Sequence, residues 1–585
     1  MNSAELSTRT FGNDDRLPRV PLPTLEESCD RFLRWCAPLL TPAELAETEA
    51  AVAEFLAPDS PARTLHAELE KYDATEGVRS WLDLFWPSRY LGRRDRIALN
   101  ANFFFLFEDV PLGQVERAVS LVSAAVDYKL ALDVEAVPPV VLRGQPQSME
   151  QQKFLFSTTR IPGVRQDTVR APYGHGWDGP SPARHIAVFH RGAVYSLDVL
   201  SDGRPYPAEA LAEGLRSIMA EAVRPASPVG HLTTKARAEW AASREALLRE
   251  NAEAVEVIES ALFCLCLEDF APADTQAACD QLLHGDSGNR WFDKAVSLIV
   301  FADGRAGINV EHCGLDGTTI LAFTDALLRP IIPRSTEFAT GKPAVTPVEF
   351  TVDDALRADI AEAASSFAAY AADTATSIVS FPDFGADAIK ALGMSPDAFV
   401  QMAYQLAHKR SKGLTGATYE SIATRQFQNG RTEAMRVVTP EVLAFVKAMD
   451  DPSPEVRRAA FRAAAAAHVA RAKECQAGQA PEQHLWELQW IQRRQGGTAP
   501  LPLYDSPGWL IMRDDYLSTS SAPSTTIQYF GFGSTSKQCI GVAYVLLPDR
   551  FNVYLSTPRA VSHEMMKFAD HLRDAVAELG ALLAD

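Results

Sequence analysis

The segment 297–317 reads SLIVFADGRAGINVEHCGLDG, and its pattern predicts a β-hairpin. Residues 297–301 are apolar, which is typical of a buried strand. Asp303 and Gly304 suit a tight turn, after which 307–310 return as a second strand. The residues that follow the hairpin therefore stand at a strand end, where side chains can enter a cleft.

Two residues of the same segment have the chemistry of a catalytic site. His312 stands at the strand end, and histidine is a suitable general base because its pKa lies near neutral pH. Asp316 follows four residues later, before a glycine, and can fold back to hold the imidazole or the loop. A histidine that only caps a turn would show the same spacing, so the spacing alone leaves both interpretations open.

Length and composition limit what the chain can be. It has 585 residues, more than one hydrophobic core usually fills, so two large domains are expected. The formal charge of −19 argues against a nucleic-acid partner. We find no apolar run of the roughly 20 residues that span a bilayer. The N-terminus lacks the apolar stretch of a secretory signal, so we expect a cytoplasmic protein without a membrane span.

The eight cysteines do not resemble a disulfide framework in so long a chain. Only Cys264 and Cys266 are close in sequence, and no second pair completes a zinc site. We expect buried, reduced thiols and no structural metal.

Helices and strands are mixed without the strict alternation of a Rossmann repeat, which favours a layered α/β fold. Helix starts are indicated by Thr24 with Glu27, by Ser395-Pro396 and by Thr439-Pro440. A proline-rich stretch at 330–347 suggests a domain boundary. Further strands are expected in a hairpin at 185–200 and near 508–518, 526–532 and 538–556.

The H-x-x-x-D-G pattern of 312–317 resembles that of a superfamily of thioester-dependent acyltransferases, which includes chloramphenicol acetyltransferase. Further motifs narrow the resemblance to the carnitine/choline O-acyltransferase family, from about residue 18 to the C-terminus. In chain order they are 160–163 (RIPG) with 166–168 (QDT), 289–294 (NRWFDK), 311–312 (EH), 418–421 (TYES), 430–432 (GRT), 445–449 (FVKAM) and 517–520 (LSTS).

The resemblance implies a two-domain α/β architecture like that of chloramphenicol acetyltransferase, with an active-site tunnel between the domains. One domain would be 76–344, with the histidine, and the other 19–75 plus 345–585, with the Ser-Thr-Ser motif. Residues 1–18 are expected to form a disordered arm. By the same analogy we expect a monomer.

The resemblance also implies roles for particular residues. His312 matches the base that deprotonates the acceptor hydroxyl, and Asp316 matches its supporting carboxylate. Ser520 matches the hydroxyl that stabilises the oxyanion, and Ser518 and Thr519 of the same motif would contact substrate.

The acceptor side departs from the carnitine-using pattern. Tyr419 and Thr432 match residues that hold the carnitine carboxylate, but Gln483 replaces an arginine. An amide holds a carboxylate less firmly than a guanidinium does. The acceptor is therefore expected to be a choline-like, carnitine-like or other small alcohol.

The donor side is altered as well. Lys390 is retained from the lysine-rich loop that meets the phosphates of coenzyme A, whereas Ala386 replaces another lysine. The basic stretch 408–412 (HKRSK) is either a solvated helix end or a dock for an acyl carrier protein. Phe530 aligns where a bulky residue shortens the acyl pocket, which favours short acyl groups.

We therefore expect an O-acyltransferase that moves a short acyl group from acyl-coenzyme A to a small alcohol without an acyl-enzyme. One alternative takes the acyl group from the phosphopantetheine of a carrier protein in natural-product biosynthesis. The other is a binding protein that has lost catalysis.

Overall fold

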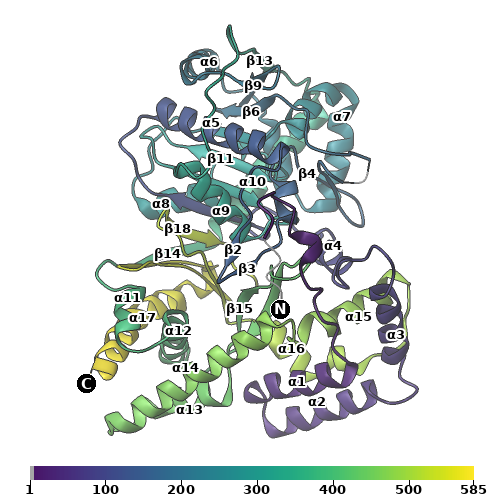
Figure 1. Ribbon diagram of the computed structural model, residues 1–585, viewed down its shortest axis with the longest axis vertical. Helices are drawn as coiled ribbons and strands as arrows, with labels where there is room; N and C mark the ends of the chain where they lie inside the picture. The colour runs from purple at the N-terminus through teal and green to yellow at the C-terminus, as the bar shows by residue number, and fades with distance from the viewer. Residues whose placement is uncertain (1–5, 175, 585) are drawn as a thin grey trace. The chain divides into compact units, whose positions relative to one another are not determined.

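The computed structural model describes residues 6–174 and 176–584, and it divides into two compact units. Unit 1 comprises the chain up to Arg16 together with Pro87–Thr374 and Ser524–Gly533. Unit 2 comprises Leu17–Trp86, Ala375–Pro523 and Ser534–Asp585. Both combine helices with one large sheet, so the expected two-domain α/β class is confirmed (Figure 1).

Unit 1 is built on a mixed eight-stranded sheet in the order β13-β7-β6-β10-β11-β12-β1-β18. Its central strands are buried along their whole length, because helices such as α5, α7 and α8 pack against the sheet (Figure 1). The strands are β1 (Asn102–Phe107), β6 (His185–His190), β7 (Ala193–Asp198), β10 (Cys264–Leu267), β11 (Val296–Val300), β12 (Ala306–Glu311), β13 (Val345–Val348) and β18 (Ile527–Phe532).

The helices of unit 1 are α5 (Gln114–Asp133), α6 (Ala208–Glu221), α7 (Arg237–Ser260), α8 (Thr275–Leu283), α9 (Gly317–Leu328) and α10 (Asp354–Ala372). Short strand pairs join β2 (Val141–Leu142) to β3 (Gln145–Pro146), β4 (Thr159–Ile161) to β5 (Thr168–Arg170), and β8 (Leu200–Ser201) to β9 (Arg204–Pro205). Helix α4 (Phe85–Tyr90) crosses the boundary between the units.

Unit 2 has a six-stranded sheet in the order β14-β20-β19-β17-β15-β16. The strands are β14 (Thr374–Phe381), β15 (Thr418–Ala423), β16 (Thr432–Arg436), β17 (Leu517–Ser521), β19 (Ile540–Leu546) and β20 (Phe551–Pro558). The helices are α1 (Leu25–Cys36), α2 (Pro42–Phe55), α3 (Pro61–Asp73), α11 (Ala386–Ala391), α12 (Pro396–Lys412), α13 (Pro440–Ala448), α14 (Pro454–Gln476), α15 (Glu482–Arg494), α16 (Pro507–Arg513) and α17 (Ser562–Ala584).

Several elements form where the sequence predicts them. Thr24 and Glu27 make the expected capping box of α1, and Ser395 and Thr439 cap α12 and α13 through their side chains. The segment 297–310 is the hairpin of β11 and β12, and Gly304 in its turn has φ +86°. All eight cysteines are free of disulfides.

Two expectations were wrong in the part of the chain that the structure describes. A strand expected near 508–518 is instead helix α16 followed by β17, because Ser506 accepts from the Trp509 N–H and Pro507 begins the helix. The expected disordered arm is packed from residue 6 onward: Thr10 donates to the Val137 carbonyl, and buried Asp14 accepts from Ser148. Residues 1–5 of that arm lie outside the described residues.

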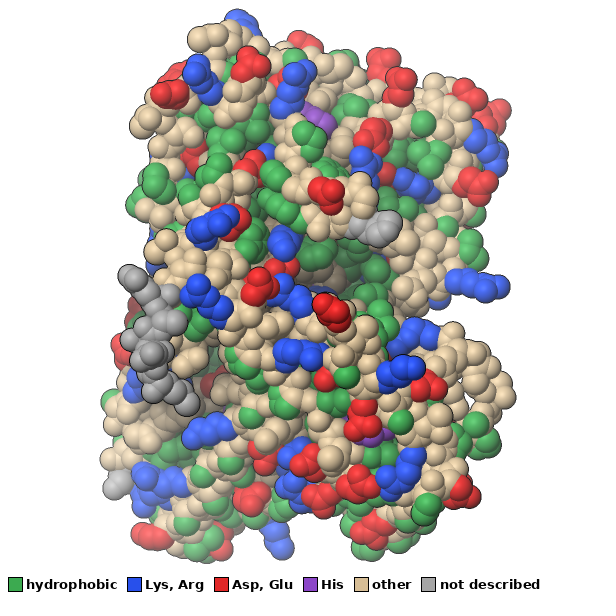
Figure 2. Space-filling model, turned by 45° about the vertical axis from the view of Figure 1, so that its right-hand side comes forward, with side chains coloured by type: hydrophobic (Ala, Val, Ile, Leu, Met, Phe, Trp, Pro, Cys, Tyr) green, Lys and Arg blue, Asp and Glu red, His purple; other side chains and the backbone are tan. Residues whose placement is uncertain are grey.

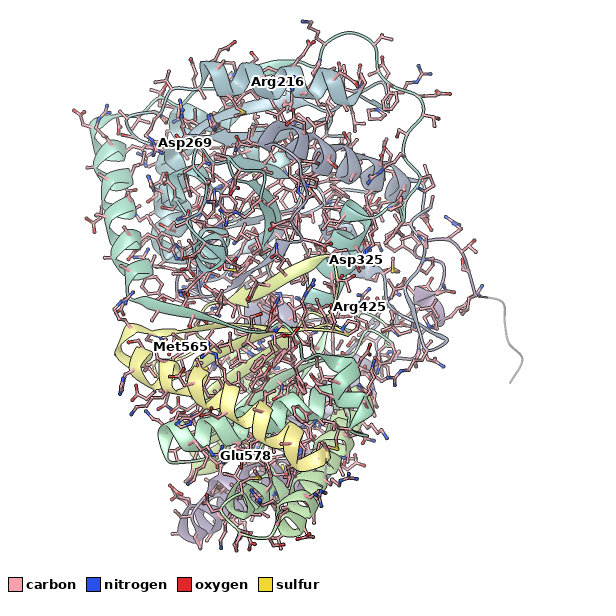
Figure 3. All side chains as sticks on the ribbon, turned by 90° about the vertical axis from the view of Figure 1, so that its left-hand side faces the viewer. Arg216, Asp269, Asp325, Arg425, Met565 and Glu578 are labelled. Atoms are coloured by element: carbon pink, nitrogen blue, oxygen red, sulfur yellow. The ribbon has the colours of Figure 1, made fainter. Side chains whose placement is uncertain are left out.

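The domain boundaries also differ from those expected. Residues 524–533 join the sheet of unit 1, because β18 pairs along β1. Ser524 and Thr526, just before β18, both donate to Asp325 of α9 (Figure 3) at 2.5 and 2.6 Å. This stretch is held in unit 1 by backbone pairing and by side chains.

The face drawn in Figure 2 does not resemble a nucleic-acid interface. On the face shown in Figure 2, acidic and basic side chains are interspersed without a continuous basic band. Within the described residues, no helix combines the length and apolar character needed to cross a bilayer.

Gly307 tests the close packing of β12. A Cβ there would lie 2.4 Å from Leu282 Cδ1 and 2.5 Å from the Phe105 carbonyl oxygen. We expect Gly307→Ala to lower the free energy of unfolding by about 1–3 kcal/mol, measured as a fall in the urea midpoint. Gly317→Ala, whose Cβ would meet nothing within 4 Å, is the control. Equal midpoints for the two variants would contradict this account.

Candidate active site

His312 follows the last residue of β12 and is held by the loop that leads to α9. Its Nδ1 lies 2.6 Å from the Leu315 carbonyl oxygen. A carbonyl only accepts hydrogen bonds, so Nδ1 carries the proton. In neutral His312 the other nitrogen, Nε2, is therefore unprotonated and can accept a proton, which is what a general base requires.

Asp316 is buried beside this imidazole. One carboxylate oxygen lies 3.5 Å from His312 Nδ1, and the other accepts from the Gln151 side chain at 2.7 Å. Gln151 in turn accepts from the Asp316 backbone N–H and from Thr319, at 2.8 Å each. Gln151 therefore fixes the carboxylate that supports the histidine loop.

Two aromatic residues of unit 1 flank the imidazole. The Tyr90 hydroxyl lies 3.4 Å from His312 Nε2, and the two ring centroids are 5.0 Å apart. Phe103 of β1 meets the imidazole edge-on at 5.2 Å. The imidazole thus lies beside an apolar ring, and its Nε2 lies beside a polar hydroxyl.

Phe530 belongs to the same aromatic cluster. It pairs with Phe105 across β18 and β1, and its ring lies 5.5 Å from that of Phe105 and 6.2 Å from that of Phe103. The Phe530 ring therefore packs near Phe103, which in turn packs against the His312 imidazole.

In unit 2, strand register places several of the candidate residues on one face of the sheet. Tyr419 of β15 is opposite Ser518 of β17, and Ser520 follows on the same face, because successive side chains alternate. Across β15 and β16, Tyr419 is opposite Arg436 and Ala423 is opposite Thr432. Tyr419, Thr432, Ser518 and Ser520 therefore share one face.

Thr519 points to the opposite face. Its hydroxyl donates to the Tyr419 carbonyl at 2.9 Å and accepts from Gln401 of α12 at 2.9 Å. The residue has no exposed surface. The structure thus places Thr519 as a brace between β17, β15 and α12, separate from the face of Ser518 and Ser520.

A polar cluster lies on that second face, with His468 and Glu420 buried and Asp397 half-exposed. His468 of α14 is 2.8 Å from Glu420, and the Tyr544 hydroxyl donates to Asp397 at 2.5 Å. Burial and the neighbouring Asp397 raise the pKa of Glu420. Burial alone would lower the pKa of His468, but the neighbouring Glu420 outweighs this and raises it.

The same cluster is where a metal ion would find ligands among the described residues. Asp397, Glu420 and His468 each have a ligating atom within 4.8 Å of the others. The expectation of no structural metal stays a prediction.

Gln483 of α15 is buried behind β16. Its amide donates to the Thr432 carbonyl at 2.8 Å, and only 1% of the residue is exposed. Nearby, Arg436 is committed to Glu482 by two bonds of 2.7 Å and to Asp515 by one of 2.6 Å. Gln483 therefore fixes the backbone at Thr432, and Arg436 is bound to two carboxylates.

Comparison with known proteins adds the family. The family model described as choline/carnitine O-acyltransferase matches residues 20–574. The chain belongs to this family. Carnitine O-acetyltransferase of Rattus norvegicus is 30% identical, over 99% of this chain and 95% of that protein. Mitochondrial carnitine O-palmitoyltransferase 2 of Rattus norvegicus is 31% identical, over 97% and 93%. Among solved structures, trichothecene 15-O-acetyltransferase of Fusarium sporotrichioides aligns at TM-score 0.40 and 11% identity, covering 83% of this chain and 92% of that one.

Membership in the family makes the chain an acyltransferase. The names of its relatives include an acetyltransferase and a palmitoyltransferase at nearly equal identity. Similarity to these relatives therefore gives no preference for one acyl length.

The expected donor-side residues of this acyltransferase lie at the surface of unit 2. The Lys390 side chain is 62% exposed, 3.3 Å from Asp387. In the basic stretch 408–412, Arg410 pairs with Glu578 at 2.7 Å (Figure 3) and Lys412 with Glu564 at 3.3 Å. His408 is buried, and burial lowers its pKa to about 4. Two of the four basic residues are thus paired with carboxylates of α17.

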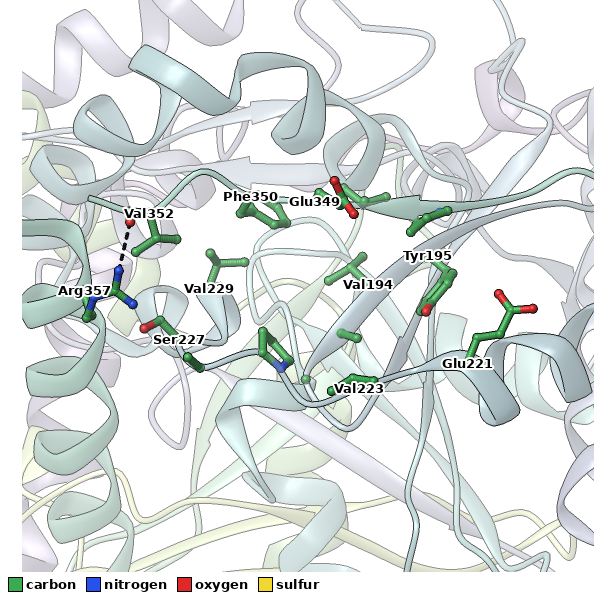
Figure 4. Close-up of a pocket in the computed structure, with 16 residues that line it drawn as sticks. Val194, Tyr195, Glu221, Val223, Ser227, Val229, Glu349, Phe350, Val352 and Arg357 are labelled. Carbon is green, nitrogen blue, oxygen red and sulfur yellow. Dashed lines mark hydrogen bonds between the residues drawn. The ribbon is translucent and has the colours of Figure 1, made fainter. Parts of the chain in front are cut away.

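A separate pocket of about 540 Å³ lies along β7 and β13 in unit 1 (Figure 4). Its lining includes Tyr195, Glu221 and Arg357. His312, Asp316 and Phe530 do not line it, so the candidate active site is not this pocket.

Sequence reasoning missed the residues that hold the site. Gln151 contacts Asp316 across 165 residues, and Gln401 contacts Thr519 across 118. No local pattern marks either glutamine. Arg160 did carry a signal, since it begins the RIPG motif, but the motif alone gave it no role.

Proposed function

We propose that this acyltransferase moves a short acyl group from acyl-coenzyme A to the hydroxyl of a small alcohol, with His312 as general base. The observation that carries the proposal is the short contact from His312 Nδ1 to the Leu315 carbonyl oxygen. It commits Nδ1 as donor and leaves Nε2 to accept a proton.

The reaction needs no acyl-enzyme. Nε2 takes the proton of the acceptor hydroxyl as its oxygen attacks the thioester carbonyl. Ser520 donates to the oxyanion of the tetrahedral intermediate. When the intermediate collapses, the C–S bond breaks and the imidazolium returns its proton to the leaving thiolate.

On the acceptor side, Tyr419 and Thr432 would contact the alcohol, and Gln483 would act through the Thr432 backbone. Without a guanidinium at 483, we propose that an acceptor lacking a carboxylate, such as choline, is used at least as well as carnitine. The engagement of Arg436 by Glu482 and Asp515 supports this, since no bidentate donor there is left over for a carboxylate.

On the donor side, Lys390 would meet the phosphates of coenzyme A. The pairing of Arg410 and Lys412 with α17 supports coenzyme A over a carrier protein, because an acidic carrier would compete with Glu578 and Glu564 for those cations. We propose that the enzyme acts as a cytoplasmic monomer, and the free cysteines fit a reducing compartment.

The function is tested by thiol release from acetyl-coenzyme A, with and without choline or L-carnitine. We expect release that requires an alcohol and is lost in His312→Ala. Ser520→Ala should lower kcat by about 10²–10³, or about 2.7–4 kcal/mol, because one oxyanion donor is removed. Ser521→Ala, on the exposed next residue of β17, should retain full activity.

Two outcomes of this assay would contradict the assignment. Release that survives in His312→Ala would show that another group is the base. Tight substrate binding with no thiol release, across a panel of alcohols and acyl-coenzyme A donors, would favour the silent binding protein.

The acceptor preference is tested at position 483. We expect Gln483→Arg to raise kcat/KM for L-carnitine by about tenfold or more, because a charged hydrogen bond to a carboxylate is worth about 1.5–3 kcal/mol. The value for choline, which has no carboxylate, should not rise. A parallel rise for both alcohols would contradict the proposed preference for an acceptor that lacks a carboxylate.

The acyl length is tested at Phe530. Because this ring packs on Phe105 and Phe103 near His312, we expect Phe530→Gly to shift the ratio of kcat/KM from acetyl- toward octanoyl-coenzyme A. Tyr529→Leu, on the other face of β18, should leave the ratio unchanged. An unchanged ratio in Phe530→Gly would remove Phe530 from the acyl pocket.

A further inference from the structure

The RIPG motif has no part in the reaction proposed above, yet its first residue lies next to the catalytic segment. Arg160 is on β4, and its side chain has no exposed surface. Burying a guanidinium is costly unless its N–H groups are paired with acceptors. Its contacts are therefore informative about what it holds.

The guanidinium of Arg160 joins three separate segments of unit 1. Nε donates to Asp167 at 2.6 Å, Nη1 to Glu311 at 3.0 Å, and Nη2 to the Tyr90 carbonyl oxygen at 2.7 Å. The planar fork of an arginine spreads its N–H groups over three nitrogens in fixed directions. A lysine ammonium carries its three N–H groups on one nitrogen and cannot reach acceptors spaced in this way.

Two of these contacts lead to residues that adjoin His312. Glu311 directly precedes it, and both carboxylate oxygens lie 3.2 Å from the Cys313 backbone N–H, so Glu311 closes the chain around the histidine. Tyr90 places its hydroxyl 3.4 Å from His312 Nε2. One buried side chain thus connects the backbone that carries the imidazole to the residue that faces its reactive nitrogen.

Further residues of unit 1 hold Arg160 and its partner Asp167 in place. Its backbone N–H donates to the Asp293 carbonyl at 2.9 Å. Arg237 donates to Asp167 at 2.7 Å and to the Asp293 carboxylate at 2.6 Å. The guanidinium therefore has little freedom to follow a shift of either segment, and it can hold both in register.

We propose that Arg160 is a positioning residue for His312: it sets the imidazole against Tyr90 through Glu311 and the Tyr90 carbonyl. This inference rests on the proposed function, in which His312 Nε2 takes the acceptor proton. A base displaced by about 1 Å can lose about 10²-fold in rate without any change in substrate binding.

Arg160→Lys tests the inference, because lysine keeps the buried charge but cannot serve all three acceptors. We expect kcat to fall by about 10- to 100-fold, with KM for both substrates unchanged within about twofold. Arg290→Lys is the matched control: Arg290 is also 1% exposed and pairs with Glu268 at 2.5 Å, but it contacts neither Glu311 nor Tyr90. A comparable loss of kcat in both variants, at equal folded fraction, would overturn the specific role.

A double-mutant cycle shows whether Arg160 acts through Glu311. We expect Arg160→Lys to cost less in kcat on a Glu311→Gln background than on the wild type, because the carboxylate that Arg160 holds is already lost. If Arg160→Lys lowers kcat by the same factor on both backgrounds, coupling through Glu311 would be overturned.

The imidazole can be observed without turnover. In ¹⁵N-histidine spectra, with His312 assigned by difference from His312→Gln, the wild type should show the Nδ1–H tautomer. Arg160→Lys should average the two tautomers, and Arg290→Lys should not. An unchanged His312 signal in Arg160→Lys would overturn the positioning role. Absence of acyl transfer in the wild type would instead count against the proposed function.

Discussion

The hydrogen bond from His312 Nδ1 to the Leu315 carbonyl oxygen is the contact on which the rest of the site depends. It is local, spanning three residues, yet it decides which nitrogen of the ring can act as a base. The surrounding residues serve to keep that short loop in place. Asp316 and Gln151 hold it from the α9 side, and Glu311 holds it from the β12 side.

In unit 2 the comparable constraint is the alternation of side chains along β15 and β17. Because neighbouring residues point to opposite faces, a three-residue motif is divided between two tasks. Ser518 and Ser520 share a face with Tyr419, whereas Thr519 joins Gln401 and the Tyr419 carbonyl beneath it. The run of three hydroxyl residues is thus divided: Ser518 and Ser520 belong to one face of the sheet, and Thr519 is an internal brace on the other.

Local physical rules explain what the sequence could predict. Capping residues, the tight turn at Gly304 and the strand-end histidine depend on residues a few positions apart, and these features form as expected. The failures concern either a cap that went unrecognised, at Ser506 and Pro507, or contacts between distant segments. Thr10 reaches Val137 and Arg160 reaches Glu311 across 127 and 151 residues. No periodicity in a single chain reports such pairs, so the strand-end position of His312 was predictable and its supporting contacts were not.

The pairing of β18 with β1 in the sheet of unit 1 has a consequence for how the chain folds as it is synthesised. In unit 1 the edge of β1 that faces away from β12 pairs with β18, which begins at Ile527 of 585 residues. A ribosome has therefore synthesised nearly all of the polypeptide before the sheet that carries the histidine can be completed. Until then the nascent chain exposes the unpaired edge of a strand of sequence NFFFLF, a ready template for intermolecular pairing. Expression yield is thus expected to depend on chaperone capacity late in translation, and C-terminal truncation before Ile527 would leave that edge permanently open.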